Sequence, residues 1–288
     1  MVALFVANET DTLEWNESPV PLSEVNQLMM LRDQLLVVKL GGSTLEAERA
    51  VLRDIVRLHT CGIKVVLVHG GGPSINECLT QFQIPVQFEQ GLRVTDARTL
   101  KVVRMVLCGQ INQELVAMTE QLGGRAVGLS GMDDHMIHAH IADERLGFVG
   151  AVDAVDVSLL ERISNEGYIP IVAPLGLDER GQCLNINADL AASHIAAALK
   201  ADRLIFLSNV PGICQPDGSL ITELDAPQAH ALIEQGVISG GMLPKVNACL
   251  DAARAVSCVQ IVDGRRDHAL LYGILKSQFN GTRFTRAR

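Results

Sequence analysis

The sequence predicts an α/β protein: a three-layer αβα sandwich around one largely parallel, open sheet, arranged in two lobes. Short aliphatic runs alternate with amphipathic segments along the 288 residues, which is the pattern of successive βαβ units. Aromatic residues make up only 3% of the chain while hydrophobic residues make up 48%, as suits aliphatic strands beneath Ala- and Leu-rich helices. The glycine clusters directly follow predicted strands, and ligands bind at those ends of open α/β sheets.

The first half of the chain begins with a β-α-β-α alternation over residues 35–83. Residues 1–22 are polar and irregular, and Ser23 then fits an N-cap before a short helix. The run LLVVKL is a strand, and VVLVH is a second strand that ends at three glycines. Thr95 fits the start of a long amphipathic helix. In this half we predict strands at 35–40, 64–68, 126–131 and 147–157, and helices at 23–34, 45–61, 73–83 and 95–123.

The second half again combines strands with helices. Residues 147–157 alternate enough to indicate an antiparallel strand or hairpin, whereas the later runs are apolar throughout and indicate strands buried on both faces. Gly167 is placed to end the helix before it at the C′ position. Here we predict strands at 168–176, 203–210 and 257–264, and helices at 158–167, 189–201, 227–236 and 243–256. We divide the chain into an extension, 1–34, and two lobes, 35–180 and 181–288.

Charge and cysteine usage limit the possible partners and compartment. The net charge is −9, and no basic patch is evident, which disfavours binding of nucleic acid or of an anionic membrane. No apolar run approaches the ~20 residues of a membrane span. The seven cysteines are scattered without a CxxC pair, as expected for free thiols, and the N-terminus does not resemble a signal peptide. We therefore expect a cytoplasmic protein.

Two glycine clusters indicate an anion site. Gly41 and Gly42 follow the first strand, and Gly70–Gly72 follow the second. Such runs let backbone N–H groups face an anion without an intervening Cβ, and the next helix adds its positive end. A tight turn without a ligand is the alternative for either cluster alone. Two clusters at equivalent strand ends favour the anion site, and we expect the glycine loops, including Gly131 and Gly212, to meet at one edge.

Charged residues near the glycines are the candidates for chemistry. Lys39 interrupts an apolar strand, and burying an ammonium without a partner is unfavourable, so it should reach toward a phosphate or carboxylate. A solvent-facing lysine on an edge strand is the alternative. Lys245 begins a helix after Pro244. Asp189 opens another helix, where simple capping would also explain it. Arg93 precedes a helix and suits bidentate binding of a carboxylate.

Several common motifs are absent from the sequence. There is no P-loop, protein-kinase, HExxH, GxSxG or dinucleotide GxGxxG pattern. His135, His138 and His140 cluster without metal-ligand spacing, and a solvated loop is the simpler interpretation. The sequence therefore predicts no metal site formed by the protein itself.

The chain resembles the N-acetyl-L-glutamate kinases of the amino acid kinase family over roughly residues 35–284. The matching blocks keep the family order, and together they are specific, although each alone is weak. They are VVKLGG, VVLVHGGGPSIN, GLRVTD, AVGLSG, LGFVGAV, GYIPIVAPLG, NINADLAA, LSNVPGI, GGMLPKVNACLDAA and GTR. The resemblance implies an amino acid kinase-like fold and ATP-dependent phosphorylation of the side-chain carboxylate of N-acetyl-L-glutamate, a step of arginine biosynthesis.

The resemblance also implies residue roles, with ATP as cosubstrate and Mg²⁺ carried by ATP. The lysines of the first glycine strand and the GMxxK block hold the phosphates, and the aspartate of NxNAD orients both lysines. These catalytic residues correspond to Lys39, Lys245 and Asp189. The glycine loops that contact the phosphoryl group correspond to Gly41, Gly42, Gly70, Gly71 and Gly72. Substrate-binding residues correspond to Gly71, Gly72, Arg93, Asn185 and Asn187. Nucleotide-binding residues correspond to Ser208, Asn209, Val210, Gly212, Met242 and Lys245. The lobe 35–180 would bind the acetylamino acid and dimerise, and 181–288 would bind ATP.

Three positions depart from the pattern of many relatives. Met132 replaces a lysine in GLSGMDD, next to the expected substrate lid, and Asn209 replaces an aspartate near the nucleotide. Tyr272 stands where arginine-inhibited relatives carry a glutamate, so we do not expect arginine feedback. We expect a homodimer at least, with a hexameric ring of dimers and a PII-type signalling partner as further options.

Two other functions stay open on the sequence alone. A kinase for aminoadipate or glutamate carried by an acidic carrier protein would tend to lose the NxNAD asparagines and gain basic residues near the substrate, but this acidic chain keeps NINAD. A non-catalytic sensor could keep the fold. A sensor has no need to keep Lys39, Lys245 and Asp189 together, so their joint presence favours the enzyme.

Overall fold

The computed structural model describes residues 12–13, 20–41, 45–275 and 281–285, and its centre is an eight-stranded sheet. The order across the sheet is β16-β18-β17-β13-β3-β4-β10-β7. Neighbouring strands are parallel except for the antiparallel pair β17–β18, so the predicted, largely parallel sheet is confirmed. The strands are β3 (Leu35–Leu40), β4 (Lys64–His69), β7 (Ala126–Ser130), β10 (Ile169–Ala173), β13 (Arg203–Ser208), β16 (Glu223–Leu224), β17 (Cys258–Asp263) and β18 (Gly281–Phe284).

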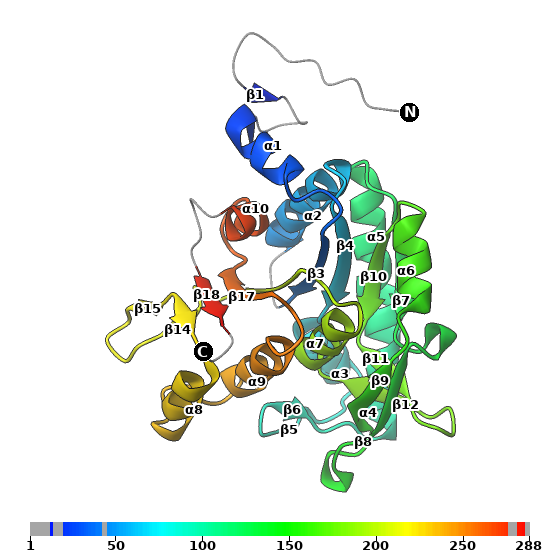
Figure 1. The fold of residues 1–288 in the computed structure, drawn as a ribbon. Helices are drawn as coiled ribbons and strands as arrows, with labels where there is room; N and C mark the ends of the chain where they lie inside the picture. Colours follow the sequence, from blue (N-terminus) through cyan, green and yellow to red (C-terminus); the bar gives the residue numbers. More distant parts are fainter. Residues whose placement is uncertain (1–11, 14–19, 42–44, 276–280, 286–288) are drawn as a thin grey trace.

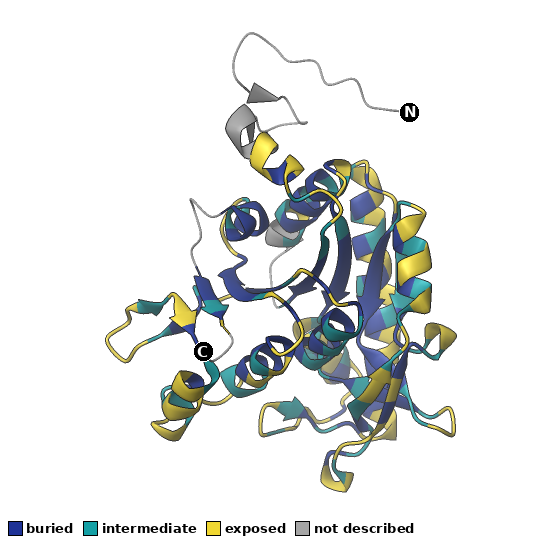
Figure 2. Cartoon of the chain, viewed as in Figure 1, coloured by how far each residue is buried: buried dark blue, intermediate teal, exposed yellow. Residues whose placement is uncertain are grey.

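Helices cover both faces of this sheet, which confirms the three-layer arrangement (Figure 1). One face packs against α6 (Ser158–Asn165), α7 (Ala188–Ala198) and α9 (Met242–Ala252). The other face packs against α2 (Leu45–Thr60), α5 (Asn112–Gln121) and α10 (Ala269–Ile274). Alternate side chains of each strand enter the two cores, because successive residues of a strand point to opposite faces. The buried strands accordingly lie between helices that are exposed on their outer sides (Figure 2).

A second β unit lies at the carboxyl end of the main sheet, together with helices α3 (Gly72–Gln81) and α4 (Ala97–Arg104). It is a closed four-stranded arrangement of β8 (Ile137–Ile141), β9 (Val149–Val155), β11 (Leu175–Leu177) and β12 (Cys183–Ile186). β8 and β9 are antiparallel, which confirms the antiparallel prediction for 147–157. The prediction of one strand over 168–176 is wrong. Pro174 separates β10 from β11, since proline cannot donate a ladder hydrogen bond.

Some helix boundaries differ from the prediction for clear reasons. The first helix, α1 (Leu22–Met29), begins before Ser23 and ends five residues early, so Ser23 is not its N-cap. The helix expected from Thr95 begins at Ala97, because Asp96 accepts a hydrogen bond from the Thr99 amide and is the cap. That helix also contains a π-helical stretch, η1 (Met105–Ile111), before α5. The helix 158–167 ends as predicted, with Gly167 at φ 75°.

The remaining elements are short and were mostly not predicted, because two or three residues carry no periodicity. They are β1 (Thr12–Leu13), β2 (Val20–Pro21), β5 (Phe88–Glu89), β6 (Leu92–Arg93), η2 (Asp133–His135), η3 (Glu144–Leu146), β14 (Ile213–Cys214), β15 (Leu220–Ile221) and α8 (Ala226–Glu234), of which only α8 was expected. Among the helices of the described ranges, none combines the length and the apolar character needed to cross a bilayer. The seven cysteines are free, as expected.

Candidate functional site

The candidate site lies where β3 and β4 end side by side. Their register pairs Lys39 with Val68 and Leu40 with His69, so both glycine loops leave the sheet at the same level. A cavity of about 310 Å³ opens there, lined by Lys39, Gly41, Gly70–Gly72 and Asn185, among others. The cavity therefore combines a lysine, two glycine loops and a residue of the NINAD segment. Gly42, the other glycine of the first loop, lies outside the described residues.

Asp189 joins two lysines that are far apart in the chain. Its Oδ1 lies 2.8 Å from Lys39 Nζ and 3.0 Å from Lys245 Nζ, and its Oδ2 also accepts from Lys245 at 3.0 Å. Each of the three residues is only 8% exposed. Lys39 comes from β3, Asp189 from the first turn of α7, and Lys245 from the first turn of α9. We call these three residues the Lys–Asp–Lys cluster.

The electrostatics of this cluster favour a bound anion. Two ammonium groups face one carboxylate, which leaves one net positive charge in a buried place. Burial lowers the pKa of Lys39 more strongly than the Asp189 carboxylate raises it, and the neighbouring Lys245 lowers it further. Burial would raise the pKa of Asp189, but the two lysines hold it below its ordinary value. An incoming phosphate oxygen would balance the excess charge.

Asp189 is free to contact the lysines because another residue caps its helix. The side chain of Asn187 accepts hydrogen bonds from the Asp189 and Leu190 amides, at 2.9 and 3.2 Å, and is the N-cap of α7. The simple capping role considered for Asp189 is therefore wrong. Asn187, which the resemblance implies at the substrate, uses its side-chain oxygen as this cap.

The glycine loops approach the cluster closely. A Cβ at Gly41 would lie 2.5 Å from Lys39 Nζ, and a Cβ at Gly71 would lie 2.6 Å from Ile111 Cδ1. Gly70 donates its amide to the carbonyl of Leu40, which ties the second loop to the first strand. Gly71 is the N-cap of α3, whose first N–H groups lack intrahelical partners. The loops therefore leave room and donors for an anion at Lys39.

Asn185 lines the cavity, and Arg93 contacts Gly72, which also lines it. Arg93 is 8% exposed; its Nη2 donates to the Gly72 carbonyl at 3.3 Å, and its guanidinium lies 4.8 Å from the Phe88 ring centre. Burial lowers the pKa of Arg93. Its Nη1 is buried, and the described residues offer it no hydrogen-bond acceptor. Asn185 lines the cavity and donates to Thr95 Oγ1, which in turn donates to the Arg93 carbonyl.

The expected nucleotide residues follow β13, beside β3. Ser208 is buried at the end of β13, opposite Asp263 of β17, and Asn209 beyond it is exposed. Val210 and Met242 are half-buried, and Met242 precedes Lys245 in the first turn of α9. Gly212, at φ 147°, packs against Thr282 and Leu220. Gly131 packs on Leu175 and Ile137 instead, so these two glycines contact their own surroundings and not the loops at Lys39.

The departures from the family pattern lie at different places. Met132 is half-buried and packs with the apolar cluster around α3 and α4. Tyr272 lies on α10, with its ring edge-on to His268 at a centroid distance of 6.2 Å. His268 in turn contacts the buried carboxylate of Asp54 at 2.9 Å. Tyr272 therefore belongs to the far face of the sheet, away from the Lys–Asp–Lys cluster.

Two further buried polar residues, His69 and Asn112, lie beside the glycine loop and were not among the residues predicted for the site. His69 is 1% exposed and Asn112 is 2% exposed; the Asn112 amide lies 3.2 Å from His69 Nε2, and His69 Nδ1 lies 2.8 Å from the Gly70 carbonyl. A lone histidine between a strand and a glycine run has no distinctive spacing, and Asn112 is remote in sequence. Only the position of His69 directly before the glycines could have identified it.

Acid should weaken the fold through His69. Burial lowers its pKa from 6.5 to about 4, so the folded protein resists a protonation that the unfolded chain accepts. The contribution of neutral His69 to the free energy of unfolding is complete above pH 6.5 and is lost as the pH falls through about 4. The free energy of unfolding should decrease by about 3 kcal/mol over this range. We expect His69→Asn to show a flatter pH dependence in urea unfolding between pH 7 and 4. Identical slopes for the variant and the natural chain would contradict this.

Comparison with known proteins agrees with this geometry. Residues 34–263 match the model of the amino acid kinase family. An acetylglutamate kinase of Gloeobacter violaceus is 48% identical, with 86% of each chain covered, and one of Porphyra purpurea is 44% identical, with 91% of this chain and 95% of the relative covered. The solved structure of smu.665 from Streptococcus mutans superposes with a TM-score of 0.77 at 31% identity, covering 87% of this chain and 98% of that one. The chain belongs to the amino acid kinase family, in its acetylglutamate kinase branch.

Proposed function

We propose that this chain transfers the γ-phosphoryl group of ATP to the side-chain carboxylate of N-acetyl-L-glutamate, forming N-acetyl-L-glutamyl 5-phosphate in arginine biosynthesis. The observation that carries the proposal is the Lys–Asp–Lys cluster, whose two ammonium groups meet one carboxylate beside two glycine loops. The names of the 41–48% identical relatives, all acetylglutamate kinases, support the substrate.

The residues present suit this reaction because its nucleophile needs no activation. A carboxylate is ionised at neutral pH, so no general base is required. What the transfer needs is positioning and neutralisation of charge on the phosphoryl oxygens. Lys39, nearest the glycine loops, is proposed to face the transferring group, and Lys245 the leaving phosphates. The Asp189 carboxylate offsets the repulsion between the two ammonium groups. It is not proposed as a base, since it is already paired with both lysines.

ATP would enter with Mg²⁺ bound to its phosphates, and the chemistry of the cluster fits that arrangement. The Asp189 carboxylate is occupied by two lysines, so the phosphate oxygens would hold the ion. When bound, Mg²⁺ neutralises phosphate charge. We propose that Ser208, Asn209, Val210, Gly212 and Met242 form the nucleotide side, within residues 181–288. Residues 35–180, with Asn185 and Asn187 from the neighbouring segment, would form the amino-acid side.

Arg93 is proposed to bind a carboxylate of the acetylamino acid. A buried guanidinium N–H without a partner is unfavourable by about 1–3 kcal/mol, and an incoming carboxylate would satisfy it. We expect Arg93→Lys to raise the KM for acetylglutamate at least tenfold, because lysine cannot form two parallel hydrogen bonds. The KM for ATP should change little. Steady-state kinetics with each substrate varied in turn checks this, and an unchanged acetylglutamate KM would remove Arg93 from the substrate site.

A homodimer is proposed as the smallest assembly, in the cytoplasm, with a hexamer and a PII-type partner as further options. The large apolar side chains of Phe82, Phe88 and Met105 are 52%, 55% and 59% exposed around α3 and α4. Exposed apolar residues of this size are common at subunit interfaces, which supports self-association at this end of the molecule.

The function is tested by ATP-dependent hydroxamate formation with N-acetylglutamate, glutamate and aminoadipate in parallel, each with and without arginine. We expect product with N-acetylglutamate, little with the others, and no inhibition by arginine. A preference for aminoadipate or glutamate would support the carrier-linked alternative. Nucleotide binding without transfer to any acceptor would support the non-catalytic sensor.

A further inference from the structure

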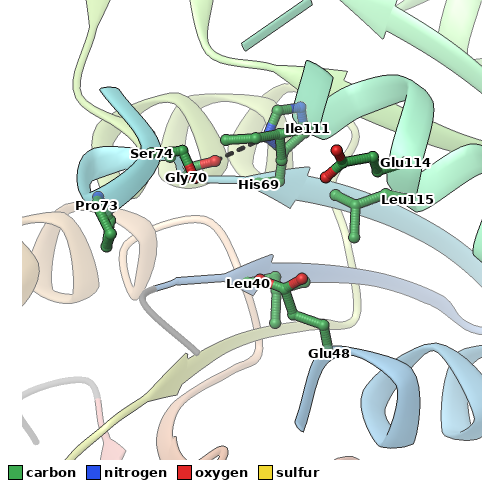
Figure 3. A pocket seen from close by; sticks show the side chains of 10 residues that line it. Leu40, Glu48, His69, Gly70, Pro73, Ser74, Ile111, Glu114 and Leu115 are labelled. Atoms are coloured by element: carbon green, nitrogen blue, oxygen red, sulfur yellow. Dashed lines mark hydrogen bonds between the residues drawn. The ribbon is translucent and has the colours of Figure 1, made fainter. Parts of the chain in front are cut away.

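The peptide that joins Gly70 to Gly71 lies between two cavities. The larger one, about 310 Å³, contains Lys39, and the smaller one, about 80 Å³, is lined by His69 and Ser74. Gly70 and Gly71 line both cavities. Figure 3 shows the smaller cavity, with His69 and Ile111 near the loop and the carboxylates of Glu48 and Glu114 further along. His69 and Lys39 therefore lie on opposite sides of the same loop peptide.

The hydrogen bonds of His69 define its tautomer. A carbonyl oxygen can only accept, so Nδ1 carries the proton that is donated to the Gly70 carbonyl at 2.8 Å (Figure 3). Nε2 is then bare and accepts from Asn112 Nδ2 at 3.2 Å. Both ring nitrogens are thus used by a neutral imidazole. The ring fixes the direction of one carbonyl, which is the first carbonyl of the glycine run.

The direction of that carbonyl determines where the next N–H points. The chain has no cis peptide bond in the described residues, and a trans peptide places its C=O and N–H on opposite sides. With the Gly70 carbonyl held toward His69, the N–H of Gly71 points away from His69, and Gly71 lines the cavity that contains Lys39. Within the described residues, no acceptor takes this N–H. It is therefore available as a donor beside the cavity that contains Lys39.

Packing keeps the histidine and the loop in this position. Asn112 Nδ2 also donates one hydrogen to the Ile171 carbonyl at 2.8 Å. Its other hydrogen is shared between His69 Nε2 and the Leu129 carbonyl, both at 3.2 Å, so Asn112 ties His69 to β10 and β7. A Cβ at Gly128 would collide with Asn112 Oδ1. The π-helical stretch η1 ends just before Asn112 and presses Leu107 and Ile111 against Gly71. Such π-helical turns often occur at functional sites.

We propose that His69 is a positioning residue that holds the Gly70 carbonyl so that the Gly71 N–H donates to the phosphoryl group during transfer. This inference rests on the proposed function, because it names a donor for the same reaction. His69 itself does not touch the reacting atoms. Its effect is transmitted through one peptide plane, and a donor aimed at developing charge acts mainly on the transfer step.

The test compares three variants of the full chain. His69→Leu keeps the apolar bulk and removes both ring nitrogens. His69→Asn supplies a side-chain amide that can replace Nδ1 as the donor to the Gly70 carbonyl. Ser74→Ala is the matched control, since Ser74 lines the same small cavity without a hydrogen bond to the loop carbonyl. We expect His69→Leu to lower kcat by about 100-fold with KM values for both substrates within about threefold. His69→Asn should recover most of the loss, and Ser74→Ala should match the natural chain.

Calorimetry separates this inference from the proposed function, since it needs no acceptor. Binding of MgADP with fluoroaluminate, a mimic of the transferring phosphoryl group, should weaken at least tenfold in His69→Leu, whereas MgADP alone should bind equally to all variants. If the natural chain phosphorylates another acceptor, the proposed function fails but these ratios still decide the inference. Unchanged kcat and fluoroaluminate binding in His69→Leu would overturn it. A lower kcat together with raised KM values, neither restored in His69→Asn, would also overturn it.

Discussion

Replacement of Lys39 or of Lys245 with methionine is expected to lower kcat roughly a thousandfold or more, while the fold persists. Each ammonium is proposed to neutralise charge that develops on the phosphoryl oxygens, in a site with little water to replace it. The fold should survive because Asp189 keeps one lysine partner in either variant. Methionine also retains most of the buried aliphatic volume.

The hydroxamate assay and thermal unfolding check this prediction together. Lys101→Met, on the exposed side of α4, is the control for loss of a positive charge. It should have the natural kcat. A folded Lys39→Met protein with near-natural turnover would remove Lys39 from the reaction, and the same holds for Lys245.

Replacement of Asp189 with asparagine should damage both stability and turnover. It leaves two ammonium groups buried together without a carboxylate, and breaking a buried ionic group in this way is unfavourable by about 3–5 kcal/mol. Their mutual repulsion should also separate the ammonium groups and lower kcat by orders of magnitude. Urea unfolding at pH 7 measures the first effect, and the hydroxamate assay measures the second.

A double variant distinguishes repulsion from simple loss of packing. Asp189→Asn combined with Lys39→Met removes one of the two like charges, so much of the lost stability should return while turnover stays low. Additive losses in the double variant would show that the lysines do not repel each other there. Natural stability in Asp189→Asn alone would mean that the carboxylate is not needed to hold the cluster.

The main sheet and the Lys39 loop could be predicted because their signals are local. Six-residue aliphatic runs followed by glycine are specific for buried strands that end at a ligand edge, and LLVVKLGG shows the lysine and the turn together. The approach of Lys245 to Asp189 is not local. It follows from the resemblance to a family, since a separation of 56 residues carries no periodicity of its own.

The predictions that were wrong lie where two local sequence signals compete. NINAD offers both Asn187 and Asp189 as helix caps, and only the observed start of α7 shows that asparagine caps while aspartate stays free. Pro174 lies inside an apolar run that otherwise predicts one strand. The π-helical stretch before Asn112 has no sequence signature, so the His69–Asn112 contact could not be foreseen.

The most direct test of the account is a crystal structure of the chain with MgADP, fluoroaluminate and N-acetylglutamate. We expect the planar aluminium fluoride to lie between the glutamate carboxylate and the ADP β-phosphate. A fluoride or a β-phosphate oxygen should lie within hydrogen-bond distance of each of the Lys39 and Lys245 Nζ atoms, at about 2.7–3.1 Å. An aluminium fluoride bound elsewhere, with the two lysines still paired only to Asp189, would contradict it.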